Sequence, residues 1–301
     1  MTTMRSRAIR LLLQGTSRRA YSGRAFLPSQ ALLNVTGPQH RRGDQMKWMA
    51  AAALIGGMSI VCSAQALNQA SSRSIQAEEL YLKPSYDRRE LLKFIHRAVD
   101  DAPQDVELLW RLARAAYDVA SLSTTLPDEK KTLTYYARDT IAKALDLDDN
   151  NFAVHKWFGI ILSSVGDFEG SKATIANSYI VRDHWLRAIE LNPSDSTSHH
   201  LLGRWALTIA DISWLERQVA AAIFGSPPTA TYAQALDHFL QADAISPGFW
   251  KKNTLMIAQT YLKMRDKAKA KEWVEKALTI SSSTEEDNQV HKEALALLAT
   301  L

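Results

Sequence analysis

The sequence predicts an all-α fold, a solenoid of stacked helical hairpins with inserted helices and a C-terminal capping helix. Two observations support this fold class. One spaced pattern of helix endings recurs five times, and the apolar residues around the endings follow helical stripes. At 46% apolar and 23% charged, the 301 residues also have the composition of a folded globular protein. We expect the solenoid to occupy residues 74–301.

The recurring pattern reads small residue, three others, large apolar residue, two others, alanine, four others, proline. Positions four and seven apart lie on one stripe of a helix, so the small residues let a neighbouring helix approach while the large residue fills the space between. Proline then ends the helix. The copies, some with a substituted position, are Leu91, Ile95, Ala98 and Pro103; Ala137, Ile141, Ala144 and Asp149; Val181, Trp185, Ala188 and Pro193; Ala235, Phe239, Ala242 and Pro247; and Ala270, Val274, Ala277 and Ser282.

Residues 1–47 form a basic leader. No acidic residue precedes Asp44, and arginines alternate with apolar residues, serine and threonine. This composition is typical of a mitochondrial transit peptide, and residues 19–22 (RAYS) resemble a matrix-protease cleavage site. A disordered basic tail has the same composition and stays open as an alternative.

The leader also accounts for the basic character of the whole chain. Residues 1–73 hold nine Arg and one Lys against one Asp, a net charge of +9. Because the chain as a whole carries +4, residues 74–301 carry about −5. The solenoid therefore lacks the positive field of a nucleic-acid-binding protein, and we expect no nucleic-acid partner.

Residues 48–73 form an uncharged apolar segment followed by a short linker. The apolar run WMAAAALIGGMSIVC covers 15 residues, whereas a helix that spans a bilayer needs about 20. An extension to residue 67 reaches that length but brings in Gln65. The segment is either a membrane anchor at residues 48–67 or a small-residue helix that lies on protein. It also holds Cys62, the only cysteine, so the chain cannot form an intrachain disulfide.

Each helix ending needs a partner helix before it. We expect first helices from residue 74 and around residues 110–117, 154–158, 200–203 and 254–261, where aromatic and apolar residues share a stripe. Residues 284–287 (TEED) resemble a capping box, and residues 290–301 predict the final helix that covers the open end of the stack.

Three insertions interrupt the regular spacing of the hairpins. Residues 124–131 are expected to lengthen a loop, and residues 168–178 to extend the helix that leads to Trp185. Residues 211–232 predict an added amphipathic helix that ends before Pro227. We expect its apolar residues to pack back on the solenoid, because exposed patches of this size are uncommon; the alternative is a partner-binding ridge. These residues are Trp214, Val219, Ile223 and Phe224.

The helix pairs resemble the tetratricopeptide repeat, which has W-x2-L-G-x2-Y in its first helix and A-x3-F-x2-A, followed by proline, in its second. The unit at residues 254–277 fits best, because it runs without an insertion. The other units are longer. The sequence therefore predicts a degenerate tetratricopeptide-like array.

Four longer stretches resemble the regulator of microtubule dynamics family. They are ELLWRLARAAYDVA (107–120), HKWFGIILSSVGDFEGSKATIANSYI (155–180), RAIELNPSDSTSHHLLGRW (187–205) and FGSPPTATYAQAL (224–236). The resemblance implies a tetratricopeptide-like helical domain associated with microtubules or spindle proteins. It also implies that some members carry an N-terminal membrane anchor and lie at mitochondria or organelle contacts.

No catalytic motif is present: the sequence has no Walker loop, GxGxxG, HExxH or GxSxG. His199 and His200 are adjacent and point about 100° apart on a helix, so they cannot share one metal ion. We expect neither a catalytic residue nor a metal or cofactor. The expected role is binding.

Candidate partner-binding residues follow from counting along the first helices, which line the concave groove of such a stack. They are Arg111, His155, His200, Arg204, Lys252, Gln259 and Lys263. Arg and Lys in this groove would accept an acidic peptide, such as a tubulin tail, or a phospholipid headgroup. The alternative is that these side chains are merely solvated.

Two functions follow from these observations. The first is a non-enzymatic interaction scaffold that binds microtubules, tubulin or a spindle protein, as the resemblance implies. The alternative is a mitochondrial adaptor or membrane-contact module that holds a peptide or a phospholipid in its groove. The expected location is accordingly mitochondrial, cytoplasmic or on spindle microtubules.

Overall fold

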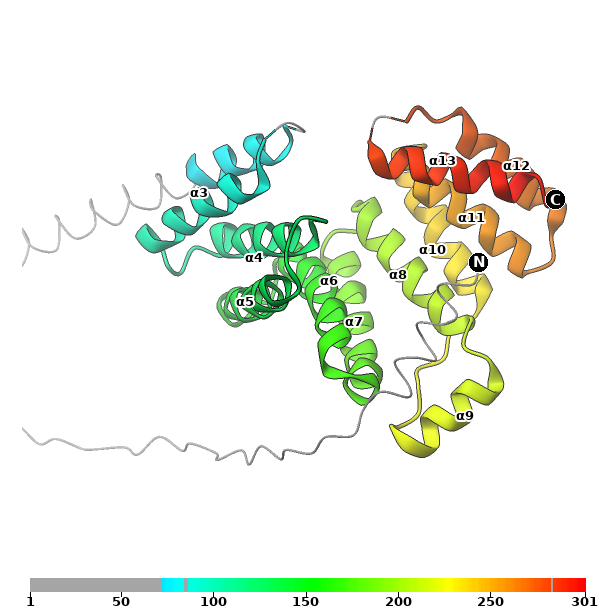
Figure 1. Ribbon diagram of the computed structural model, residues 1–301, viewed down its shortest axis with the longest axis horizontal. Helices are drawn as coiled ribbons and strands as arrows, with labels where there is room; N and C mark the ends of the chain where they lie inside the picture. Colours follow the sequence, from blue (N-terminus) through cyan, green and yellow to red (C-terminus); the bar gives the residue numbers. More distant parts are fainter. Residues whose placement is uncertain (1–71, 84–85, 283) are drawn as a thin grey trace, which may run out of the picture.

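The computed structural model describes residues 72–83, 86–282 and 284–301. These residues fold into helices that pack as consecutive hairpins in a curved array (Figure 1). A helix over residues 72–81 pairs with α3 (Arg88–Asp101). The next pairs are α4 (Val106–Ser121) with α5 (Pro127–Leu147), α6 (Phe152–Glu169) with α7 (Ser171–Leu191), α8 (Ser196–Ala210) with α10 (Tyr232–Ile245), and α11 (Lys251–Lys263) with α12 (Lys267–Thr279). The last helix is α13 (Glu285–Leu298), and α9 (Trp214–Ile223) lies between the members of the fourth pair.

The seams between helices are made by the recurring small and large residues, as the sequence predicts. The alanine of the pattern is at most 1% exposed in all five copies, and the large apolar residue is buried in each. In one core cluster, Ala137, Ile141 and Ala144 of α5 pack with residues of α4 and α6. Each hairpin therefore buries its apolar stripe against the next one, which produces a core that continues along the stack.

Most helices begin at a side chain that the sequence provides for capping. Asp105, Asn151 and Asp195 accept hydrogen bonds from backbone N–H groups in the first turns of α4, α6 and α8. The capping box predicted at Thr284 is confirmed, since its hydroxyl and the Asp287 carboxylate each accept from the other residue's backbone. These caps satisfy N–H groups that no residue inside the helix can reach.

The insertions have three different outcomes. The prediction that residues 124–131 lengthen a loop is correct for residues 124–126, which lie between α4 and α5. It is wrong for residues 127–131, which form the start of α5 with Pro127 in its first turn. Proline at a helix start costs no hydrogen bond and fixes a helical φ angle, which explains the longer helix. The prediction that residues 168–178 extend the helix leading to Trp185 is confirmed for residues 171–178, because α7 runs unbroken from Ser171 to Leu191. It is wrong for residues 168–170, because Phe168 and Glu169 end α6 and Gly170 lies between the two helices.

The added helix forms as predicted, but its packing differs from the prediction. Figure 1 shows α9, in yellow, standing away from the body of the array. Trp214 is 74% exposed and Ile223 is 65% exposed, and Ala220 is the buried residue of α9. The expectation that the apolar residues pack on the solenoid is therefore wrong for Trp214, Val219 and Ile223, whereas Phe224 is half-buried. Periodicity identified the apolar stripe, but it carries no information on whether a neighbour covers that stripe.

Among the described residues, no helix combines the length and the apolar character needed to cross a bilayer. The basic leader and the apolar run at residues 48–62 lie outside the described part of the chain. The predictions about a transit peptide and a membrane anchor therefore remain predictions.

Candidate binding groove along the first helices

A groove of about 810 Å³ runs along the first helices of successive hairpins, from residues 72–81 to α8. A hollow of about 460 Å³ adjoins it and shares Tyr117, Ile160 and Leu201 with it. The groove is rich in aromatic rings, which come from Tyr81, Trp110, Tyr117, Phe152, Trp157 and Trp250.

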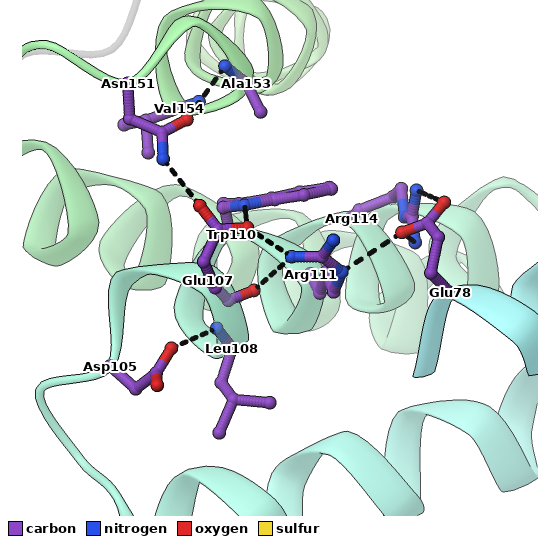
Figure 2. A network of polar contacts seen from close by, with 10 residues as sticks. All are labelled: Glu78, Asp105, Glu107, Leu108, Trp110, Arg111, Arg114, Asn151, Ala153 and Val154. Atoms are coloured by element: carbon purple, nitrogen blue, oxygen red, sulfur yellow. Dashed lines mark hydrogen bonds and ion pairs between the residues drawn. The ribbon is translucent and has the colours of Figure 1, made fainter. Parts of the chain in front are cut away.

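Helix α4 supplies the centre of the groove wall. The cap at Asp105, which accepts from Leu108 N at 2.9 Å, fixes the start of this helix. Trp110 lies one turn on, where its ring is buried and its Nε1 donates to Glu107 Oε2 at 3.0 Å. Glu107 and Trp110 thus have fixed positions in the groove wall (Figure 2).

Two arginines of α4 converge on one carboxylate of the preceding helix. Arg114 donates from its two terminal nitrogens to the two oxygens of Glu78, at 3.0 and 2.9 Å. Arg111 donates from Nε to the same carboxylate at 3.0 Å, and from Nη1 to Glu107 Oε2 at 2.6 Å. Figure 2 shows Arg111 between the two glutamates. Charge-assisted hydrogen bonds of this two-pronged kind are the strongest that side chains form.

The network also reaches the next hairpin and the aromatic rings. Asn151, which caps α6, donates to the other oxygen of Glu107 at 2.7 Å. The Arg111 guanidinium lies 4.0 Å from the Trp110 ring centroid, and that of Arg114 lies 3.5 Å from the Tyr81 ring centroid. Cation–π contact adds to the ion pairs and orients the guanidinium groups.

The charges in the network fix the ionisation of the two glutamates. Burial raises the pKa of Glu78, but hydrogen bonds and charges from Arg114 and Arg111 outweigh burial and lower it below its ordinary value. Burial likewise raises the pKa of Glu107, and hydrogen bonds from Arg111, Trp110 and Asn151 lower it. Both carboxylates are therefore ionised at neutral pH and neutralise the arginines.

A third cation of the groove is paired in the same way. Lys156 of α6 lies 3.0 Å from Asp195, and both side chains are 15% exposed. Asp195 also caps α8 through Ser198 N at 2.9 Å. The pair thus joins two hairpins across the groove, and the positive charge of Lys156 is held by the chain's own carboxylate.

Of the residues predicted to face the groove, the two histidines do not. His155 and His200 are buried, at 7% and 0% exposed, so the prediction of an accessible position is wrong for both. His155 Nδ1 lies 2.9 Å from His184 Nδ1 on α7, and His200 Nδ1 donates to Asn253 Oδ1 at 2.9 Å. Counting along one helix gives a face, but the neighbouring helices decide whether that face is open.

The remaining predicted residues are divided between the groove and other surfaces. Arg111 lines the groove and Arg204 lines the adjoining hollow. Lys252 pairs with Glu286 at 3.2 Å, and Lys263 with Asp211 at 2.8 Å, away from both hollows. Gln259 is half-buried and lines neither hollow. A binding role for these residues stays a proposal.

Sequence reasoning missed Arg114, Lys156 and Glu78. Arg114 stands three residues after Arg111, and positions three apart share a helix face, which was an available signal. Glu78 had no such signal, because 33 residues separate it from Arg111. Within the described residues, no three His, Cys, Asp or Glu side chains form a group that could hold a metal ion.

Stacked helical hairpins whose first helices line a groove define a tetratricopeptide-like solenoid. A thermophilic TPR protein of Thermus thermophilus has the same fold, with a TM-score of 0.52 at 17% identity over 75% of this chain and 99% of that one. The family model described as Regulator of microtubule dynamics protein 1-3 matches residues 74–301, and the chain belongs to this family.

Individual relatives agree with the family model. Regulator of microtubule dynamics protein 1 of Pongo abelii is 48% identical over 65% of this chain and 63% of that protein. The Bos taurus protein of the same name is 42% identical over 79% of this chain and 76% of that protein. The match thus spans slightly less than two thirds of the first relative and about three quarters of the second.

Proposed function

We propose that this chain is a non-enzymatic scaffold that associates with microtubules and holds an acidic segment of a partner protein in the groove. The names of the relatives support a role in microtubule dynamics. The observation that carries the binding mode is the convergence of Arg111 and Arg114 on one carboxylate beside aromatic rings. Such a geometry selects a glutamate or aspartate together with an apolar neighbour. A tubulin tail, as an acidic peptide, is the candidate for this segment.

The test is co-sedimentation of the full chain with microtubules at low and at high salt. Ile160→Glu places a charge where the groove and the adjoining hollow meet, and we expect it to reduce pelleting. Leu186→Glu is the matched control, because Leu186 is an exposed residue of α7 that lines neither hollow. Pelleting of both variants at the wild-type level would rule out the groove, and no pelleting of the wild type at low salt would rule out the association.

A phospholipid in the adjoining hollow is the second candidate. Its wall combines apolar residues such as Val181 with Arg204, which is exposed and forms no ion pair with any described residue. An amphiphile with an anionic headgroup fits such a wall. Mass analysis of lipids extracted from the purified protein tests this candidate, and the absence of a stoichiometric lipid would eliminate it.

We further propose a mitochondrial address for the same molecule, supported by the arginine-rich composition of residues 1–47. Imaging of a fluorescent fusion tests it. Removal of residues 1–43 is expected to abolish mitochondrial localisation, whereas unchanged localisation would show that the leader does not direct import.

A further inference from the structure

Every cation of the groove is already paired with a carboxylate of this chain. Arg111 and Arg114 bind Glu78, and Lys156 binds Asp195. An acidic segment that enters the groove therefore meets no unpaired positive charge among the described residues that line it. It gains an ion pair only if it replaces one of these internal carboxylates.

The three internal carboxylates differ in how firmly they are held. Glu107 lies on α4 itself and accepts from Trp110 and from Asn151 of the next hairpin. Asp195 caps α8, so its departure would expose the start of that helix. The Glu78 carboxylate accepts hydrogen bonds from Arg111 and Arg114 and, among the described residues, from no other group. Its displacement by another carboxylate would leave no helix start uncapped and no donor unpaired, so Glu78 is the carboxylate that can be displaced.

The site beneath Glu78 has the shape of a receptor for a carboxylate and an aromatic ring. Tyr81 lies one helical turn after Glu78 and covers the Arg114 guanidinium at 3.5 Å. On its other sides, this guanidinium has Trp110 at 5.0 Å and Trp157 at 6.0 Å to the ring centroids. With helix 72–81 removed, two guanidinium groups would remain, framed by two indole rings. Glu78 and Tyr81 together show which ligand groups fit there.

We propose that helix 72–81 is an internal occupant of a carboxylate-binding site formed by Arg111 and Arg114, and that an acidic partner segment binds by replacing it. The partner segment carries a glutamate followed three residues later by an aromatic residue, the spacing of Glu78 and Tyr81. The proposal rests on the scaffold function above and specifies its ligand. It also makes access to the groove depend on helix 72–81, which follows the apolar segment and its linker in the sequence.

The test measures how well the full chain binds a fluorescently labelled synthetic peptide with the sequence of residues 72–83 (SRSIQAEELYLK), by fluorescence anisotropy. Glu78→Gln keeps the size of the side chain and removes its charge, which weakens the internal occupant. Hydrogen bonds between charged groups contribute enough that we expect this variant to bind the peptide about ten- to a hundredfold more tightly than the wild type. In the wild type, helix 72–81 is tethered next to the site at a high effective concentration. It therefore competes with the added peptide and keeps peptide binding weak.

Glu79→Gln is the matched control, since Glu79 is an exposed neighbour on the same helix with the same charge. We expect it to bind the peptide like the wild type. A peptide in which the residue equivalent to Glu78 is glutamine should lose the gain seen with the Glu78→Gln protein. Equal binding by wild type and Glu78→Gln, or an equal gain from Glu79→Gln, would overturn the proposal.

Two further measurements keep the outcome decisive. If Glu78→Gln does not fold, as judged by circular dichroism, Tyr81→Leu removes the ring over Arg114, keeps the carboxylate, and should also tighten peptide binding. Microtubule co-sedimentation reports on the scaffold function separately. Pelleting without any effect of Glu78→Gln on peptide binding overturns only the displacement, and a strong peptide effect without pelleting overturns only the microtubule association.

Discussion

Gly203 of α8 lies against the ring of Phe239 in α10, so closely that a Cβ atom at Gly203 would stand 2.7 Å from the Cδ1 atom of Phe239. A Cβ atom at Gly159 of α6 would likewise stand 2.3 Å from the Nε1 atom of Trp185 in α7. In both hairpins, a glycine of the first helix makes room for the large residue of the recurring pattern. The glycine therefore sets how closely the two helices of a hairpin approach.

Gly203→Ala is expected to destabilise the protein. Alanine in a helix gains about 1 kcal/mol over glycine in helix propensity. Overpacking against a buried ring costs about 1–3 kcal/mol, and Phe239 is 0% exposed. We expect a net loss, measured as a lower urea midpoint. A variant more stable than the wild type would contradict the close packing of this seam.

The apolar residues of α9 are expected to contribute little to folding. Leu215→Ser combined with Ile223→Ser should change the free energy of unfolding by no more than about 0.5 kcal/mol per site, because both side chains are 65% exposed. Ile141→Ala, at a buried seam position, should cost about 2–5 kcal/mol in the same urea titration. A large loss from the α9 substitutions would mean that this helix packs on the solenoid after all.

The part of the stability that depends on His184 and His200 is expected to fall as the pH is lowered from 7.5 to 5. Burial and the charge of His155 lower the pKa of His184 to about 4, and burial lowers the pKa of His200 to about 3. An unfolded histidine takes up its proton near pH 6.5, so acid favours the unfolded state. This part of the stability is therefore complete above about pH 6.5 and is lost as the pH falls toward 4. Urea midpoints at both pH values measure it.

The histidine variants identify the groups responsible for the loss. His200→Gln should make the difference between the two pH values smaller, because the buried imidazole is gone. His96→Gln, at an exposed position of α3, is the matched control for the loss of an imidazole that is not buried. The same pH dependence in wild type and His200→Gln would exclude His200 as a cause.

Arg265→Gly is expected to stabilise the protein by up to about 1 kcal/mol. Arg265 follows the end of α11 with a φ of 67°, a left-handed conformation in which a Cβ atom is strained. The turn is held by hydrogen bonds from Arg265 N to Leu262 O and from Asp266 N to Tyr261 O, both at 3.0 Å, which glycine retains. Thermal unfolding should show the gain, and Arg265→Ala, which keeps the Cβ atom, should show none.

The hairpin stack could be predicted from the sequence because its signal is local. Spacings of three, four and seven residues report directly on helix faces, and the burial of Ala144 and Ala242 confirms the predicted seams. Capping residues such as Asp105 and Thr284 lie within a few residues of the backbone N–H groups that they cap, so they mark helix starts locally in the sequence. These local signals are therefore sufficient to predict most of the helices and their order.

The groove contacts could not be predicted in the same way, because they depend on which helices become neighbours. Glu78 and Arg114 are 36 residues apart, and no spacing rule links them. His200 was expected to be open, but Asn253 and Trp250 from the next hairpin cover it. The direction of α9 likewise depends on contacts that its own sequence does not encode.

Helices α8 and α10 close as a hairpin even though α9 and its flanking loops come between them. The segment between α8 and α10 leaves the hairpin at one end and returns at the same end. Its length therefore does not affect how the two helices pack around Phe239. A small fluorescent tag inserted within residues 221–226 would therefore be carried outside the stack. It would give a reporter on the intact chain that leaves both ends and the groove unmodified.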